Sequence, residues 1–213
     1  MIGCRPFTDS EVRAMSAGFS GQVFEYRDRA LFMLGVNSGP RVSEMLPLTI
    51  GDVVRGGRVR RYVEVMQTKT DQTRELELNR DEQHALLGLI RAHHLAGWWG
   101  REVFLFRSRE GDNQPITRAR AWQIINGQAR RLGYDGTIGT HTMRKTFANN
   151  MYEELARRQR AGEHVDPLVE LAKAGGWKTV EAASRYLSFR REHIRACKLA
   201  FEGRFGSIPC PGC

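Results

Sequence analysis

The sequence predicts a mainly α-helical protein with a small antiparallel β-sheet, an α+β fold class, and three observations carry this prediction. Apolar residues recur at helical spacing over most of the 213 residues. Alternation of apolar and polar residues is concentrated in two neighbouring runs between residues 60 and 78. Capping residues stand at the start of several helical runs. A chain of this length has room for one good-sized domain.

The expected helices follow from their caps and breakers. Thr8 and Glu11 have the spacing of a capping box, which predicts a helix to about residue 16. A second helix over 26–38 should end before Pro40, which suits the first turn of a short helix at 41–46. Further helices are expected at 80–95, 117–132, 141–160, 167–174, 180–186 and 189–201.

β structure is expected from residue 52 to residue 78. The runs 60–67 and 73–78 alternate, and the polar segment 68–72 between them predicts a hairpin with Lys69 near its tip. Residues 103–106 should form a short buried strand or extended piece.

The charge of the chain predicts a polyanionic partner. The net charge is +9 and the pI about 9.9, which favours nucleic acid first and an anionic membrane second. The basic residues are mostly arginines, which suit bidentate contacts with phosphate. The N-terminus has no signal-peptide pattern, no run is long enough to span a membrane, and the four cysteines do not suggest a disulfide scaffold. We therefore expect a cytoplasmic protein.

The strongest candidate site begins at His141 and Arg144. Three residues apart at the start of a helix, they share one face at the positive end of the helix dipole, where anions bind well. Tyr186 follows after enough chain to fold back onto that face. The pattern indicates a phosphate site with a tyrosine nucleophile.

Other residues complete this set. Metal-free phosphoryl transfer needs cations that keep their protons, a nucleophile, and an acid for the leaving oxygen. Each candidate also has a structural interpretation when taken alone: a surface ion pair, a charged hairpin tip, a capping histidine, or a core aromatic. The candidates are Arg41 with Glu44, Lys69, His141, Arg144, Trp177 and Tyr186.

Their order resembles the catalytic domain of the tyrosine recombinase, or phage integrase, family. The family pattern is an Arg in Gly-x-Arg-x-x-Glu, a Lys on a β-hairpin, His-x-x-Arg, a His or Trp, and then Tyr. The resemblance covers about residues 7–202 and implies the DNA breaking-rejoining fold. The matching residues are Gly39-Pro-Arg41-Val-Ser-Glu44, Lys69, His141-Thr-Met-Arg144, Gly175-Gly-Trp177 (where Gly-His is commoner) and Tyr186.

The resemblance also implies roles for these residues. Arg41 and Arg144 would hold the non-bridging oxygens of the scissile phosphate, and Tyr186 would attack it to give a 3′-phosphotyrosyl link. His141 would hydrogen-bond the phosphate and help to move the tyrosine's proton. Lys69 would protonate the departing 5′ oxygen. Trp177 would donate its indole N–H to a phosphate oxygen, Glu44 would brace Arg41, and neither a cofactor nor a metal would be needed.

The same resemblance implies a domain organisation and partners. We expect a catalytic domain over residues 1–202, without the N-terminal core-binding domain common in the family, and a flexible tail over 203–213. The partner would be double-stranded DNA, on which the chain would act as a dimer to tetramer and associate with the nucleoid. The apolar stripe of the 189–201 helix suits docking onto a neighbouring protomer or in cis.

Several interpretations stay open from the sequence. A type IB topoisomerase shares the implied chemistry, and a DNA-binding regulator that has lost catalysis could keep the same fold. Cys210 and Cys213 could form half of a zinc site, although a reduced tail is favoured. The basic stretch 157–164 could touch backbone phosphates or be solvated.

Overall fold

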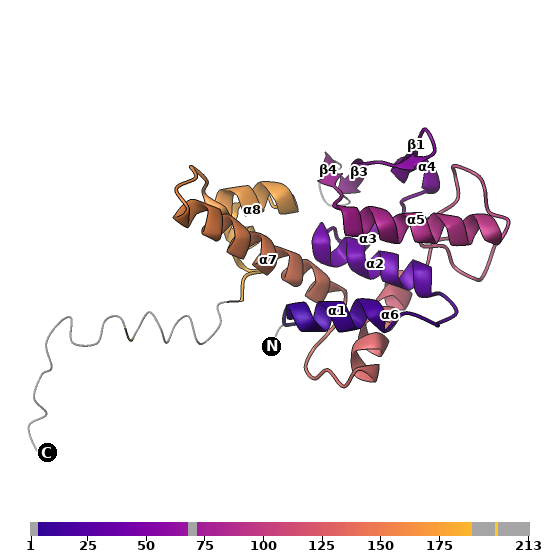
Figure 1. Ribbon diagram of the computed structural model, residues 1–213, viewed down its shortest axis with the longest axis horizontal. Coiled ribbons are helices and arrows are strands. Elements are labelled where there is room, and N and C mark those ends of the chain that lie inside the picture. Colours follow the sequence, from indigo (N-terminus) through magenta and orange to yellow (C-terminus); the bar gives the residue numbers. More distant parts are fainter. Residues whose placement is uncertain (1–3, 68–71, 189–198, 200–213) are drawn as a thin grey trace, which may run out of the picture.

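The computed structural model describes residues 4–67, 72–188 and 199. Helices predominate, and the strands form two small antiparallel sheets, which confirms the predicted fold class. Figure 1 shows α1, α2, α5 and the sheets in one part of the molecule, with α7 leading away to α8. The elements are α1 (Asp9–Ala17), α2 (Glu25–Asn37), α3 (Val42–Met45), α4 (Ile50–Val53), β1 (Val54–Arg55), β2 (Arg58–Val59), β3 (Tyr62–Gln67), β4 (Gln72–Glu77), α5 (Arg80–Leu95), α6 (Arg118–Arg131), α7 (Thr140–Arg160), α8 (Pro167–Gly175) and α9 (Val180–Ser184).

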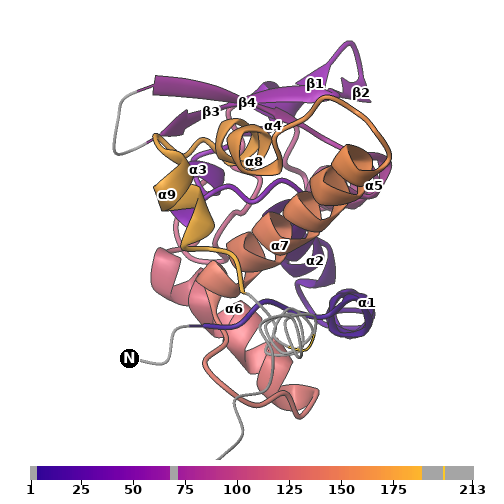
Figure 2. The same cartoon turned by 90° about the vertical axis from the view of Figure 1, so that its left-hand side faces the viewer.

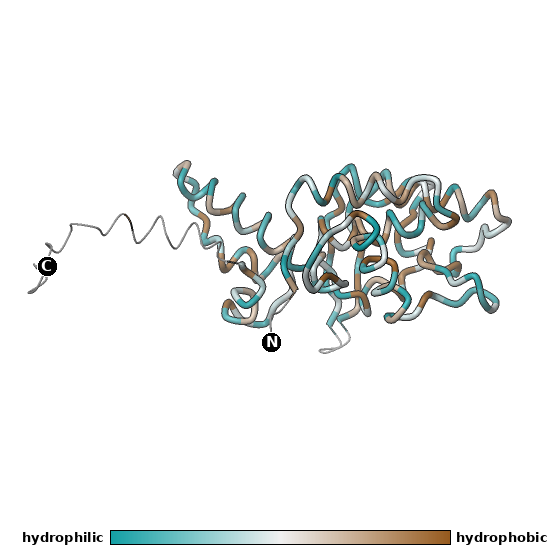
Figure 3. The backbone as a smooth tube through the Cα atoms, turned by 90° about the horizontal axis from the view of Figure 1, so that it is seen from below, coloured by the Kyte–Doolittle hydropathy of each residue, from teal (hydrophilic) through white to brown (hydrophobic). Residues whose placement is uncertain are grey.

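Two hydrophobic clusters form the core. The larger one joins α1 to α6, the hairpins and Met143 in the first turn of α7. The smaller one joins the rest of α7 to α8 and α9, around Phe147, Leu155 and Leu171. In Figure 3 apolar and polar stretches alternate along the helices, as expected for helices with one face on a core. The long helix α7 therefore belongs to both clusters.

The β3–β4 hairpin is antiparallel and has one buried face. Val63 lies opposite Leu76, and Val65 lies opposite Arg74. All four of these side chains are buried, so Arg74 occupies an inward position that the alternation would give to an apolar residue. In Figure 2 this hairpin lies above α8 and α9.

Most helix ends follow their predicted caps. The Thr8–Glu11 capping box is formed at the start of α1, and Thr179 caps α9 through a hydrogen bond from the Ala182 N–H (3.1 Å). Asp166 accepts hydrogen bonds from two backbone N–H groups at the start of α8. Gly176 ends that helix with a left-handed φ of +64°.

One detail of the predicted β structure is wrong. Residue 52 lies in the short helix α4 rather than in a strand, because the Asp52 carboxylate accepts the Thr49 N–H (2.8 Å) and so caps a helical turn. Of the two forms expected for residues 103–106, the structure has the extended piece, which contributes an isolated bridge between Thr49 and Phe104.

Three predictions lie outside the described residues. Lys69 lies in the segment 68–71 between β3 and β4, which the structure does not describe. The 189–201 helix also falls outside the described ranges except for residue 199, as do Cys210 and Cys213. Among the described residues, no helix combines the length and apolar character needed to cross a membrane.

Candidate active site

Four of the sequence-predicted residues line one cavity. It has a volume of about 300 Å³ and lies among the α2–α3 connection, the starts of α6 and α7, and the segment just after α9. Figure 2 shows α3, α7 and α9 around this region. The polar and charged residues that line it include Arg41, Arg118, Thr140, His141, Arg144 and Tyr186.

Arg41 is held in place by the helix that it precedes. It is the N-cap residue of α3, and its backbone N–H donates to Glu44 Oε2 (2.9 Å). Its guanidinium Nη1 donates to Glu44 Oε1 (2.6 Å). The Glu44 side chain is fully buried, whereas 26% of the Arg41 side chain is exposed. Arg41 therefore presents a fixed but accessible cation to the cavity.

Arg144 is the largest fully buried side chain in the described part of the chain. Its Nη1 donates to the Gly39 carbonyl, and its Nη2 donates to the Gly175 carbonyl (2.7 Å). Its Nε has no hydrogen-bond partner among the described residues. The guanidinium also lies 4.1 Å from the centre of the Trp177 ring. Arg144 thus joins the Gly39 loop, α7 and the end of α8.

Two glycines allow this close packing. A Cβ on Gly39 would lie 2.3 Å from Phe147 Cδ1, and Gly39 also has a left-handed φ of +61°. A Cβ on Gly175 would lie 1.6 Å from the Trp177 ring. Glycine is therefore required at both carbonyls that accept from Arg144.

The rings of Trp177 and Tyr186 pack against each other at a tilt, beside Arg144. Their ring centres are 5.0 Å apart, and the Arg144 guanidinium lies 5.4 Å from the Tyr186 ring. Trp177 is buried and is absent from the cavity lining, and its Nε1 has no hydrogen-bond partner among the described residues. Trp177 thus packs against both Arg144 and Tyr186 without lining the cavity.

Tyr186 is positioned by α7 as well as by α9. Asn149 Nδ2 donates to the Tyr186 carbonyl (3.0 Å), and Asn149 Oδ1 accepts the Ser188 N–H (2.9 Å). The Tyr186 N–H donates to the Ala183 carbonyl in α9 (3.0 Å). The half-buried tyrosine is therefore held from both sides at the edge of the cavity.

Positive charge is concentrated around one carboxylate. Arg74 Nη2 lies 3.6 Å from Glu44 Oε2, and Arg74 Nη1 donates to the Ala174 carbonyl (2.6 Å). Burial, together with the nearby Arg41 and Arg74, lowers the pKa of Arg144 to about 10. That value still leaves Arg144 charged at neutral pH. Burial also lowers the pKa of Arg74.

Two of these arginines escaped the sequence reasoning. The signal for Arg74 was present, because the alternation that places Leu76 inward also places Arg74 inward. Arg118 is exposed at the first position of α6 and lines the cavity. Its only signal is a cation in the first helical turn, where the helix dipole disfavours positive charge.

Of the two predicted residues that remain, the structure describes His141 but not Lys69. His141 lies in the first turn of α7, is exposed, and lines the cavity with Arg144. Lys69 lies outside the described residues, but both strands beside it are anchored near the site. Gln67 Nε2 donates to the Gly176 carbonyl (3.3 Å), and Arg74 donates to the Ala174 carbonyl.

Comparisons with known proteins identify the family of this chain. The model of the phage integrase family matches residues 6–193. The probable integrase/recombinase YoeC of Bacillus subtilis strain 168 is 30% identical over 180 residues, which are 83% of this chain and 86% of YoeC. The tyrosine recombinase XerD of Corynebacterium glutamicum is 30% identical over 129 residues, covering 61% of this chain and 40% of XerD.

Solved structures show the same fold. The XerA recombinase superposes with a TM-score of 0.71 at 16% identity, covering 96% of this chain and 66% of XerA. The XerH recombinase in a post-cleavage complex with its palindromic difH substrate gives 0.69 at 18% identity, covering 92% of this chain and 52% of XerH. The chain thus spans about half of the XerH chain. The fold is that of a tyrosine recombinase catalytic domain. The chain belongs to the phage integrase family.

Proposed function

We propose that this chain is a site-specific DNA recombinase that cleaves and rejoins strands through a 3′-phosphotyrosyl intermediate. The observation that carries the proposal is the convergence of Arg41, His141 with Arg144, and Tyr186 on one cavity from three separate parts of the chain. The similarity to XerH, whose structure is a post-cleavage complex with DNA, supports duplex DNA as the substrate.

The first step is attack by Tyr186 Oη on the scissile phosphorus. The P–O5′ bond breaks as the new bond forms, and the tyrosine loses its proton with the help of His141. Arg41 and Arg144 neutralise the charge on the non-bridging oxygens as the cations that line the cavity. Lys69 supplies the proton to the departing 5′ oxygen.

The second step reverses the first. A 5′-hydroxyl from another strand attacks the phosphotyrosine and releases Tyr186, so the energy of the phosphodiester is conserved in the covalent link. No nucleotide cofactor or metal is required for this chemistry. Exchange of strands between two duplexes implies action by a dimer to tetramer on DNA.

A cleavage assay tests the proposal. Duplexes with a nick just beyond a candidate site release a short 5′-hydroxyl fragment after cleavage, and this loss traps the covalent adduct. We expect an adduct at the DNA 3′ end that is lost in Tyr186→Phe and is insensitive to chelators. Binding without any adduct would favour a catalytically silent regulator. Plasmid relaxation without site preference would favour a topoisomerase-like enzyme.

A further inference from the structure

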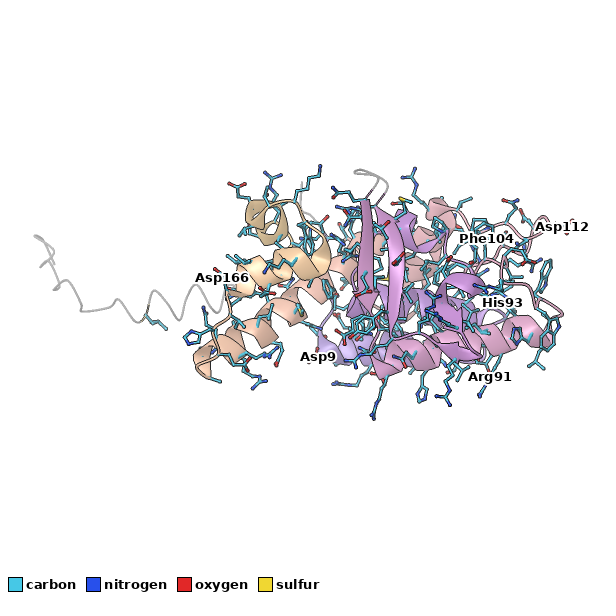
Figure 4. All side chains as sticks on the ribbon, turned by 90° about the horizontal axis from the view of Figure 1, so that it is seen from above. Asp9, Arg91, His93, Phe104, Asp112 and Asp166 are labelled. Atoms are coloured by element: carbon cyan, nitrogen blue, oxygen red, sulfur yellow. The ribbon has the colours of Figure 1, made fainter. Side chains whose placement is uncertain are left out.

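A second cleft lies away from the candidate active site. It has a volume of about 790 Å³ and lies between α4, the β1–β2 hairpin and the C-terminal half of α5. Its lining shares no residue with the cavity that holds Tyr186. Figure 4 shows Arg91, which lines it, at the opposite end of the molecule from Asp166.

The charge of this cleft is uncompensated. Its lining includes Arg55, Arg60, Arg91 and Arg101, and it contains no aspartate or glutamate among the described residues. Within the described part of the chain, none of the four forms an ion pair, and Arg60 Nε is buried without a hydrogen-bond partner.

Arginines elsewhere on the surface behave differently. Arg157 pairs with Glu154 (2.6 Å), and Arg158 pairs with Glu163 (2.8 Å). The four arginines of the cleft have no such carboxylate partners. Together they create a local positive potential that favours an anionic ligand.

The floor of the cleft is apolar. Ile50 and Ile90 lie there at 5% exposure each, with the half-buried Val54 and Leu87 beside them. On the rim, the rings of His94 and Trp99 stack with centres 4.3 Å apart and an interplanar angle of 13°. Trp99 is nevertheless 69% exposed. An apolar floor with an exposed aromatic ring and arginines around it has the residue types that are enriched at protein–protein interfaces.

The walls of the cleft are built from fixed backbone. The Gly51 N–H donates to the Arg101 carbonyl (2.7 Å), and this bond fastens the segment before residue 103 onto α4. Gly56 and Gly57 form the β1–β2 turn with left-handed φ angles of +58° and +74°. The backbone of the cleft walls is thus held in a fixed conformation before any ligand binds.

We propose that this cleft binds an acidic segment of a partner protein, with one apolar side chain on the floor and carboxylates on the arginines. The apolar floor argues for a peptide over a DNA backbone, because phosphates and sugars gain nothing from contact with Ile50 and Ile90. Binding here leaves the Tyr186 cavity open, so a partner could act on the protein while DNA is held. This inference is independent of strand cleavage.

The probe is a short capped peptide with glutamates on both sides of a central Leu-Phe pair, labelled with a fluorophore. Fluorescence anisotropy should show binding that weakens as the salt concentration rises. Replacing the glutamates with glutamines should lower the affinity by about tenfold or more. Arg91→Gln with Arg101→Gln should weaken binding by about the same factor. Tyr186→Phe should bind as the wild type does.

The matched control is the double variant Arg157→Gln with Arg158→Gln, which removes the same charge at the far end of α7. We expect it to bind the peptide normally. Equal loss in both double variants would overturn the proposal in favour of a general charge effect. Displacement of the peptide by a short random duplex would instead assign the cleft to DNA. Circular dichroism checks that all variants are folded.

Discussion

At the scale of single residues, the site depends on the buried carboxylate of Glu44. Its two oxygens face two different arginines, at 2.6 Å for Arg41 and 3.6 Å for Arg74. Arg144 lies in the same electrostatic cluster, since Arg41 and Arg74 both lower its pKa and Glu44 opposes them. One carboxylate thus offsets the mutual repulsion of three cations and fixes the cation that lines the cavity.

We predict that Glu44→Gln destabilises the protein by about 3 kcal/mol, because it leaves buried guanidinium charge without a counter-ion. The free energy of unfolding from urea titration measures this change. The control is a double-mutant cycle with Arg74→Met, which removes one of the buried guanidinium charges that Glu44→Gln leaves without a counter-ion. Glu44→Gln should cost less in the Arg74→Met background than in the wild type, and simple additivity would contradict the shared-carboxylate role.

The glycine before Pro40 offers a second prediction at this scale. Gly39→Ala should destabilise by about 3 kcal/mol, because alanine meets both the left-handed φ and the Phe147 ring. Gly97 has a similar φ of +83°, and an added Cβ there would meet nothing within 4 Å among the described residues, so it is the matched control. Gly97→Ala should cost about 1 kcal/mol. Equal losses by chemical denaturation would show that packing against Phe147 contributes nothing.

At the scale of elements, α5 begins against the end of α2. Glu82 accepts the Asn79 N–H (2.9 Å) as part of a capping box, and Ser38 Oγ donates to its other oxygen (2.5 Å). Glu82 is 1% exposed, and burial raises its pKa from the ordinary 4.5 to about 7. The cap therefore joins two elements through a group that titrates near neutrality.

This raised pKa predicts a pH dependence of stability. The proton is held more tightly in the folded chain, so the contribution of Glu82 is fully present below pH 4.5 and is lost as the pH rises through about 7. The loss should reach about 3 kcal/mol. Glu82→Gln keeps the cap acceptor without the charge, and should remove this part of the pH dependence in urea titrations. Parallel curves for the variant and the wild type would refute the assignment.

How far the sequence predicts the elements depends on the range of the contacts. Thr8 with Glu11, Asp166, and Thr179 all cap helices through neighbours in the chain, so local pattern suffices for them. The gathering of Arg41, His141, Arg144 and Tyr186 followed from a resemblance in residue order. Strand alternation could have placed Arg74 inward, but its contact with Ala174, 100 residues away, is one that no local pattern reports. Residue 52 was misassigned because a four-residue helix has too little periodicity to distinguish it from a strand.

At the scale of the whole molecule, the candidate active site lies where the two hydrophobic clusters meet. Arg144 bonds to Gly39, which connects α2 and α3 of the larger cluster, and to Gly175, which ends α8 of the smaller one. Tyr186 packs with the smaller cluster, next to Trp177. Arg41 and the proposed nucleophile Tyr186 therefore come from different packing units, with Arg144 between them on α7, and the proposed site is complete only when these units are docked.

The smaller cluster should open more readily than the larger one, because it buries fewer side chains. Leu171→Ala leaves a cavity at its centre and should lower its stability by about 3 kcal/mol. We expect faster hydrogen exchange in α8 and α9, unchanged exchange in α2 and α5, and reduced covalent adduct. Leu89→Ala in the larger cluster is the control, since it should destabilise the whole chain while the folded molecules cleave normally. If both variants accelerate exchange uniformly, the clusters unfold as one unit, and the position of Tyr186 is not set by a separate docking step.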